Sequence, residues 1–271
     1  MSTFDFTDLP EDCISYILTL SSPSDVLRSS AVSKQLLMVS ESDSVWDNFL
    51  PSDCYDIISR SPAPFSDFKS KKDLFLHLCN THVFLNENTL SFSLDKRSGK
   101  KCYMLSARAL KIEWADTLQY WSWFSMPESR FPEVAQLQEV CWLDIVGEIN
   151  TKLLTQNTTY GAYLLFKVDI DSFRGFNNPE MKVLCVCESD NKQESSVKHS
   201  DLEEDRRLSQ KDVLIKRDDG WMEIEMGRYK VGSMGNGDDK VKNLQMIMRE
   251  SKELHWKSGL IVQGIEIRPL D

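Results

Sequence analysis

The sequence predicts an α+β protein, in which a small N-terminal helical unit precedes an antiparallel β-sandwich of jelly-roll-like form. Apolar residues recur at helical spacing over the first 50 of the 271 residues. From about residue 83 the apolar spacing changes to two, and turn signals separate the runs. Long helical patterns do not interleave with these runs, which argues against a parallel α/β sheet. The chain therefore divides into residues 1–50, a connection at 51–82 with a short helix, and a sandwich at 83–271.

The first two helices are predicted from their starting residues and apolar stripes. Pro10 suits a first helical position, and Ile14, Ile17 and Leu18 follow at i, i+3 and i+4 spacing. Residues 22–25 read Ser-Pro-Ser-Asp, which offers a capping serine, a proline at the first position and an acid two residues later. Both segments are short helices by these criteria.

Two further helical segments complete the unit. A third apolar set begins at Val32 and includes Leu36 and Leu37, and a last turn bears Trp46 before Pro51 ends it. Four short helices bury little apolar surface among themselves. We therefore expect part of this surface to contact another protein.

The connection and the strands follow from local composition. Residues 51–69 contain prolines and serines and predict an irregular segment, and Ser70 begins a short helix that extends to Leu78. Residues 189–211 are strongly charged and predict a mobile loop. Period-two runs predict strands at 90–94, 110–114, 141–145, 160–168, 181–187, 222–226, 244–248 and 261–267.

Composition and charge exclude several classes of protein. The chain carries 42 acidic and 32 basic residues, for a net charge of −10, which argues against nucleic acid as a partner. Uninterrupted apolar runs never reach the ~18 residues of a membrane span. Residues 1–20 hold four acids and no Lys or Arg, unlike a signal peptide, so we expect a cytoplasmic and/or nuclear protein.

Cysteine and histidine spacing offers no metal site. The seven cysteines include no CxxC pair, and the four histidines are scattered, so we expect reduced thiols, no metal and no cofactor. Acidic pairs such as Glu113 with Asp116 could be imagined as glycosidase carboxylates, but a solvated face is the better interpretation. We therefore expect no catalytic residue.

The N-terminal motifs resemble the F-box over about residues 6–50. In order, these are Leu-Pro-Glu-Asp at 9–12, the stripe at 14, 17 and 18, Ser-Pro-Ser-Asp at 22–25, Ala-Val-Ser-Lys at 31–34 and Val-Trp at 45–46. The resemblance implies docking onto a Skp-type adaptor, which links the chain to a cullin and a ubiquitin-charged conjugating enzyme. It implies that the residues in or beside the adaptor interface are Leu9, Pro10, Ile14, Ile17, Leu18, Val32 and Trp46. Some of these must instead form the unit's own core, and the sequence does not separate the two sets.

Five aromatic blocks between about residue 100 and the C-terminus resemble the phloem protein 2 family of Nictaba-like lectin domains. The blocks lie at 110–114, 119–123, 140–145, 219–224 and 258–269. The chain thus resembles plant F-box proteins of the phloem protein 2 B-type group. The family implies binding of N-acetylglucosamine oligomers and N-glycan cores.

The same resemblance implies a carbohydrate-binding site at Trp114, Trp121 and Glu250, with Lys240 standing where the tobacco lectin has Glu. Aromatic rings pack against the apolar face of a sugar while acids accept from its hydroxyls. Either tryptophan could instead lie in the core, and Trp114 continues the apolar face of the 110–112 run.

Two functions follow from these resemblances. The first is the substrate-recognition subunit of a Skp-cullin-F-box ubiquitin ligase, whose lectin-like domain captures a glycosylated or unmodified target protein. The alternative is a carbohydrate-binding protein that acts independently of ubiquitination. A glycoside hydrolase is a third possibility, and it predicts turnover of chitooligosaccharides.

Overall fold

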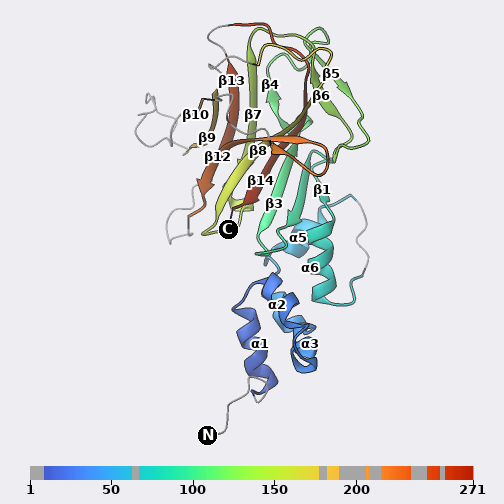
Figure 1. Ribbon diagram of the computed structural model, residues 1–271, viewed down its shortest axis with the longest axis vertical. Coiled ribbons are helices and arrows are strands. Elements are labelled where there is room, and N and C mark those ends of the chain that lie inside the picture. The colour runs from blue at the N-terminus through green and yellow to red at the C-terminus, as the bar shows by residue number, and fades with distance from the viewer. Residues whose placement is uncertain are drawn as a thin grey trace. The chain divides into compact units, whose positions relative to one another are not determined.

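The computed structural model describes residues 9–62, 67–176, 182–188, 206–207, 215–232, 243–250 and 254–270 (Figure 1). These residues fall into two compact units. The first unit is drawn from Met1–Asn86 and Phe92–Cys102, and the second from Glu87–Ser91 and Tyr103–Leu270. Within the described ranges, no helix is long and apolar enough to cross a membrane.

The first unit begins with four short helices, as the sequence predicts. Ser22 Oγ accepts a hydrogen bond from Asp25 N at 3.1 Å, and Ser33 Oγ accepts one from Leu36 N at 3.1 Å, so two of the helices have side-chain N-caps. Pro10 lies at the N-cap of its helix, one position earlier than the sequence suggested. The helices are α1 (Glu11–Thr19), α2 (Pro23–Ser29), α3 (Lys34–Ser40) and α4 (Asp43–Asp47).

Trp46 is the centre of the first unit's core. Its side chain is fully buried, and its Nε1 donates to Ser40 O at 2.6 Å. Its ring lies 5.8 Å from the ring of Phe49 and 5.1 Å from that of Phe75, measured between centroids. A tryptophan at this position therefore joins α4 to the helix that carries Phe75.

The segment between residues 51 and 82 is more structured than a connection. It forms α5 (Cys54–Ser59) and α6 (Lys71–Asn80), and both helices belong to the first unit. The predicted start at Ser70 is confirmed, since its Oγ accepts from Asp73 N at 3.1 Å. The sequence missed α5 because its first residue follows a position without a side-chain cap. Its apolar residues, Cys54 and Ile57, are nevertheless buried.

Three strands follow α6: β1 (Val83–Leu85), β2 (Leu90–Leu94) and β3 (Lys101–Ser106). The turn between β2 and β3 is held by Asp95, whose Oδ2 accepts from the backbone N–H groups of Arg97 and Ser98 at 3.1 and 2.8 Å. Gly99 has φ of +72°, and a Cβ there would lie 2.8 Å from Phe49 O. Only glycine fits this position without displacing the helical core.

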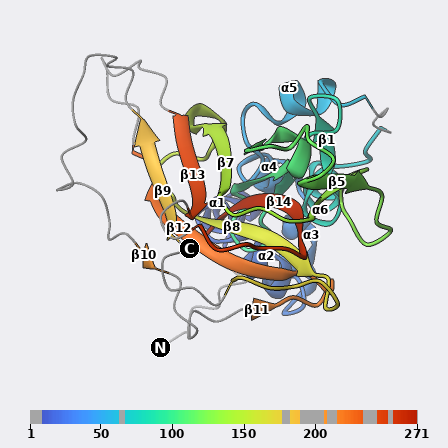
Figure 2. The same ribbon diagram turned by 90° about the horizontal axis from the view of Figure 1, so that it is seen from above.

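The strands of the second unit lie in two antiparallel sheets, which confirms the predicted sandwich (Figure 2). In the larger sheet β14 (Leu260–Pro269) lies between β3 and β8 (Thr159–Val168), and it also pairs with β6 (Val134–Leu137). The order then continues from β8 to β12 (Met222–Lys230) and β11 (Ile215–Lys216), while β5 (Trp121–Phe124) pairs with β6. The smaller sheet has the order β10 (Arg206–Arg207), β9 (Lys182–Glu188), β13 (Asn243–Glu250), β7 (Leu143–Asn150) and β4 (Lys111–Ile112). Short 3₁₀ turns lie at Ala107–Ala109 and Thr151–Leu153.

The sheets pack closely where β7 crosses β14. Every second residue of β7 is buried, and a Cβ at Gly147 would lie 2.8 Å from Ile265 Cδ1 on β14. A bulge interrupts the β14 register between Val262 and Gly264. At Gly264 φ is +156°, and a Cβ would lie 1.9 Å from Leu105 O, so a side chain at this bulge would displace β3.

The structure differs from the strand prediction at 110–114. The strand β4 ends at Ile112, and Trp114 has φ of +66°, so the chain has left the extended conformation there. The period-two pattern therefore does not continue to Trp114. The predicted loop at 189–211 lies outside the described residues apart from β10.

We predict that Trp46→Ala lowers the free energy of unfolding of the first unit by about 3–5 kcal/mol, because it leaves a cavity among buried rings. Hydrogen exchange of α1–α6, measured by mass spectrometry, reports this loss. Val32→Ala is the control, since its side chain is exposed and its effect stays within about 0.5 kcal/mol. Equal protection in the two variants would contradict the central role of Trp46.

Candidate functional site

An exposed apolar surface covers part of the helical unit. Val32, in the connection between α2 and α3, is 75% exposed, and Met38 on α3 is 66% exposed. α1 and α3 pack against each other, and Gln35 Nε2 donates to Leu9 O at 3.3 Å, which ties the start of α1 to α3. We define the apolar docking face as the large exposed side chains of these segments, Tyr16, Ile17, Leu20, Val32, Leu37 and Met38.

Three of the residues predicted beside an adaptor are instead in the unit's core. Ile14 and Leu18 on α1 are buried, as is Trp46 on α4. Their side chains are covered by the unit's own helices, so they support the docking face without being part of its surface. The structure thus shows these three residues as core, whereas contact of the other predicted residues with an adaptor stays a prediction.

The remaining predicted residues are accessible. Pro10, Ile17 and Val32 are exposed, and Leu9 is half-buried. Sequence reasoning missed Tyr16 and Leu20, although their spacing of four places them together on the face of α1 opposite the Ile14 stripe. It also did not distinguish Leu37 and Met38, which are exposed, from Leu36 and Val39, which are buried.

The two tryptophans predicted at a carbohydrate site have opposite environments. Trp121 is 0% exposed, and its Nε1 donates to Glu113 O at 3.1 Å, so its ring is not available to stack on a sugar. Trp114 is 49% exposed, and its ring meets that of Tyr120 edge-on at 6.0 Å. The left-handed backbone at Trp114 turns this side chain outward, contrary to the core position that the apolar pattern suggested.

Glu250 also differs from its predicted position at a sugar-binding surface. It is buried and forms an ion pair with Lys257, which is itself completely buried. The Lys257 ammonium also donates to Cys141 O at 3.1 Å and to His255 O at 2.7 Å. Glu250 therefore neutralises a buried lysine, a role that leaves no exposed carboxylate for a sugar. Lys240 lies outside the described residues.

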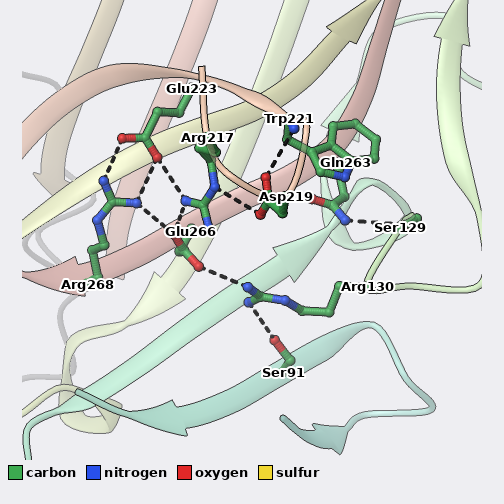
Figure 3. Close-up of polar contacts among 10 residues, drawn as sticks. All are labelled: Ser91, Ser129, Arg130, Arg217, Asp219, Trp221, Glu223, Gln263, Glu266 and Arg268. Carbon is green, nitrogen blue, oxygen red and sulfur yellow. Dashed lines mark hydrogen bonds and ion pairs between the residues drawn. The ribbon is translucent and has the colours of Figure 1, made fainter. Parts of the chain in front are cut away.

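A charged cluster lies on the outer face of the larger sheet (Figure 3). Ile265 on β14 faces the smaller sheet, so the next residue, Glu266, points to the opposite side. Its Oε1 accepts from Arg130 at 3.1 Å, and its Oε2 accepts from Arg217 at 2.8 Å and Arg268 at 2.7 Å. Glu223 on β12 also pairs with two of these arginines. We define the charged cluster as Arg130, Arg217, Glu223, Glu266 and Arg268.

The cluster holds two connections onto the sheet, the one between β5 and β6 that carries Arg130 and the one between β11 and β12 that carries Arg217. Arg130 comes from the connection between β5 and β6, and its Nη1 reaches Ser91 Oγ at 3.4 Å. Beside it Trp221 is buried against Val134 and Ile261, and Trp221 Nε1 donates to Glu128 O at 3.0 Å. The cluster's guanidinium groups thus have carboxylate partners within the fold, and its arrangement is suited to fixing loops.

Electrostatics in the cluster favour the ionised form of Glu266. Burial raises the pKa of this carboxyl, but the positive charges of the three cluster arginines outweigh burial and lower the pKa from 4.5 to about 2. Burial likewise opposes the ionisation of Glu223, and hydrogen bonds from Arg268 and Arg217 lower its pKa. Both carboxylates are therefore charged at neutral pH.

The described residues contain no group of metal ligands, and two of their thiols have a raised pKa. Among them, no group of three His, Cys, Asp or Glu side chains is placed to hold a metal ion. Burial raises the pKa of the Cys79 thiol to about 12, and burial also raises that of Cys54. These two thiols stay protonated at neutral pH, which makes them poor nucleophiles.

Comparisons with known proteins agree with both motif sets. The family model Phloem protein 2 matches residues 100–269, and the F-box domain model matches residues 6–48. In Arabidopsis thaliana, F-box protein PP2-B10 is 41% identical over 97% of this chain and 94% of its own length. F-box protein PP2-B15 is 38% identical over 96% of each chain, and F-box protein VBF is 36% identical over 96% of this chain and 98% of its own. Among solved structures, a xylan-binding domain from Paenibacillus barcinonensis Xyn10C matches with a TM-score of 0.29 and 8% identity, covering 62% of this chain and 86% of that chain.

We predict that Trp121→Ala lowers the free energy of unfolding of the second unit by about 3–5 kcal/mol, because a fully buried ring is removed. Trp114→Ala changes it by less than about 1 kcal/mol, since this ring is half exposed. Urea denaturation followed by far-ultraviolet circular dichroism measures both. Equal midpoints for the two variants would contradict the assignment of Trp121 to the core.

The Glu266 carboxylate makes the stability of the fold depend on pH in the acid range. Because the pKa of Glu266 is lower in the folded chain than its ordinary 4.5, its ionised form stabilises the fold above about pH 4.5. This stabilisation, on the order of 3 kcal/mol, is lost as the pH falls from about 4.5 to about 2. Glu266→Gln should therefore be less stable at pH 7, and its stability should decrease less steeply with acid, as measured by urea denaturation at pH 7, 4 and 3. Glu133→Gln removes a more exposed arginine partner and serves as the control. Parallel pH dependence in wild type and Glu266→Gln would contradict the prediction.

Proposed function

Because this chain belongs to the phloem protein 2 family and carries an F-box, we propose that it is the substrate-recognition subunit of a Skp-cullin-F-box ubiquitin ligase. The family relationship supports an F-box role in substrate recognition in general. The proposal adds the partners: a Skp-type adaptor and, through it, a cullin. It places this activity in the cytoplasm and/or nucleus.

The observation that carries the proposal is the apolar docking face. Six large apolar side chains are exposed on a unit whose own core is already filled by Ile14, Leu18 and Trp46. Large apolar side chains exposed on short helices are typical of a protein interface. The face includes Ile17 and Val32, which the F-box resemblance places in or beside the adaptor interface.

The sandwich supplies recognition in this proposal. It captures a target protein, glycosylated or unmodified, and brings the target's lysines close to the ubiquitin thioester on the conjugating enzyme. The contribution to the reaction is an increase in effective concentration. In this role the chain needs no nucleophile of its own.

A carbohydrate-binding protein that acts independently of ubiquitination is the second candidate. The observation that favours it is the exposure of tryptophan rings on the sandwich, including Trp114, Trp142 and Trp256. Such rings can stack on sugars such as N-acetylglucosamine oligomers and N-glycan cores. This candidate predicts no dependence on the adaptor.

We predict that the double variant Val32→Glu, Met38→Glu reduces co-purification with a Skp-type adaptor by at least about 100-fold, because two carboxylates would be buried without partners. The full-length chain is co-expressed with the adaptor, and recovery is quantified after affinity capture. Leu118→Glu is the matched control, since it adds a carboxylate at an exposed leucine of the sandwich. Equal recovery of all three proteins would contradict the docking face and favour the second candidate.

A further inference from the structure

The apolar docking face is divided between two parts of the helical unit. Three of its six residues lie on α1, and the other three lie on α3 or just before it. A partner that contacts both parts meets one prepared surface only if α1 is held in a fixed position against α3. The contacts that hold α1 in place therefore bear directly on docking.

The helix α1 has few stabilising features of its own. It is nine residues long, and isolated helices shorter than about 12–15 residues are only marginally stable in water. Pro10 at its N-cap provides no side-chain hydrogen bond, and its last turn carries no basic residue. The order of α1 thus depends on the helices around it.

Apolar packing holds α1 along one line. Its buried residues are Ile14 and Leu18, which lie one turn apart, and the helix packs against α3 and α4. Apolar contact is non-directional, so such a row restrains the rotation of α1 less than hydrogen bonds do. Directional contacts at the two ends of the helix would complete its placement.

Gln35 supplies such a contact before the start of α1. It is the second residue of α3, and its Nε2 donates to Leu9 O at 3.3 Å. The start of α3 is itself well fixed, because Ser33 Oγ accepts from Leu36 N at 3.1 Å and the Leu36 side chain is buried. The Gln35 amide therefore ties the segment that leads into α1 to a fixed part of α3.

Asn48 supplies the matching contact at the other end. It follows α4 directly, two residues after the buried Trp46, and its Nδ2 donates to Thr19 O at 2.8 Å. Thr19 is the last residue of α1, where carbonyls lack helical N–H partners, and the residue four positions later is Pro23, which has no N–H. Side-chain amides from α3 and α4 thus hold the two ends of α1.

We propose that Gln35 and Asn48 are positioning residues, which fix α1 so that its part of the docking face meets the adaptor together with the part on α3. They act by raising the fraction of chains in which both parts are aligned, and the apparent affinity for a partner falls in proportion to that fraction. The proposal rests on the proposed function, because it concerns the same docking face.

Isothermal titration of the full-length chain with a purified Skp-type adaptor tests the proposal. Gln35→Met and Asn48→Ala each remove one donor without adding a charge, and each should weaken binding about three- to tenfold, with the double variant weaker than either. Asn80→Ala is the matched control. Asn80 is an exposed asparagine of the same unit whose Nδ2 donates to Leu76 O at 2.8 Å within α6, so its loss should leave the affinity unchanged.

Rescue variants separate positioning from direct contact with the adaptor. Gln35→Lys and Asn48→Lys replace each amide by a different donor that can reach a backbone carbonyl, and both should recover most of the affinity. Hydrogen exchange of the free chains gives a second readout. Amides of α1 should lose protection in Gln35→Met and Asn48→Ala, whereas those of α6 should keep it.

Wild-type affinity in the double variant would overturn the proposal. So would an equal loss of affinity in the lysine variants, which would indicate direct contact by the amides, or a loss of protection in α6 as large as in α1, which would indicate general destabilisation. Absence of adaptor binding by the wild-type chain, with exchange of α1 responding as expected, would overturn the proposed ligase function and leave the two amides as the groups that fix α1.

Discussion

The pairing of Glu266 with three arginines is the interaction on which the outer face of the sandwich depends. Glu266 lies on β14, which pairs with β3, β6 and β8, so a shift of this strand would displace its neighbours in the larger sheet. A buried carboxylate without partners would be costly, and three guanidinium groups remove that cost. Two of them, Arg130 and Arg217, come from connections between strands, so their bonds to Glu266 also hold these connections. The charge on one central strand thus fixes the connections that run over it (Figure 3).

A second buried ion pair performs a related task at another place in the same unit. Lys257 and Glu250 are both inaccessible to solvent, and the ammonium is also saturated by backbone carbonyls of Cys141 and His255. Removal of either partner would leave a buried charge, which is more destabilising than the loss of a surface pair. Here the pair and the bond to Cys141 O tie the segment that carries Lys257 to β13 and to the segment before β7.

The helical unit is held together by apolar packing around one tryptophan. Its helices are short, and a single buried tryptophan with two phenylalanine neighbours provides much of its interior. A unit of this size covers its core but leaves further apolar side chains in water. The proposed docking depends on this surplus, because the same small size that limits the core keeps the outer apolar residues exposed.

Local sequence patterns predict the class of fold, the capped starts of α2 and α6, and most strands of the sandwich. These depend on local patterns, such as the capping serines and the alternation along β7 and β8, which are legible without tertiary contacts. The family resemblances likewise rest on ordered local motifs. The helix α5 was missed because it has no such signal at its start.

The exposure of the predicted site residues depends on tertiary contacts. Alternation suggested a buried Trp114, but a left-handed residue interrupts the strand and exposes it, while Trp121 is covered. The Glu250 carboxylate forms an ion pair with a lysine seven residues away, and the cluster around Glu266 joins residues from separate loops. Exposure and charge pairing depend on which segments fold over a position. Residue type and spacing indicate the candidates, and the packing of distant segments decides which of them can reach a partner.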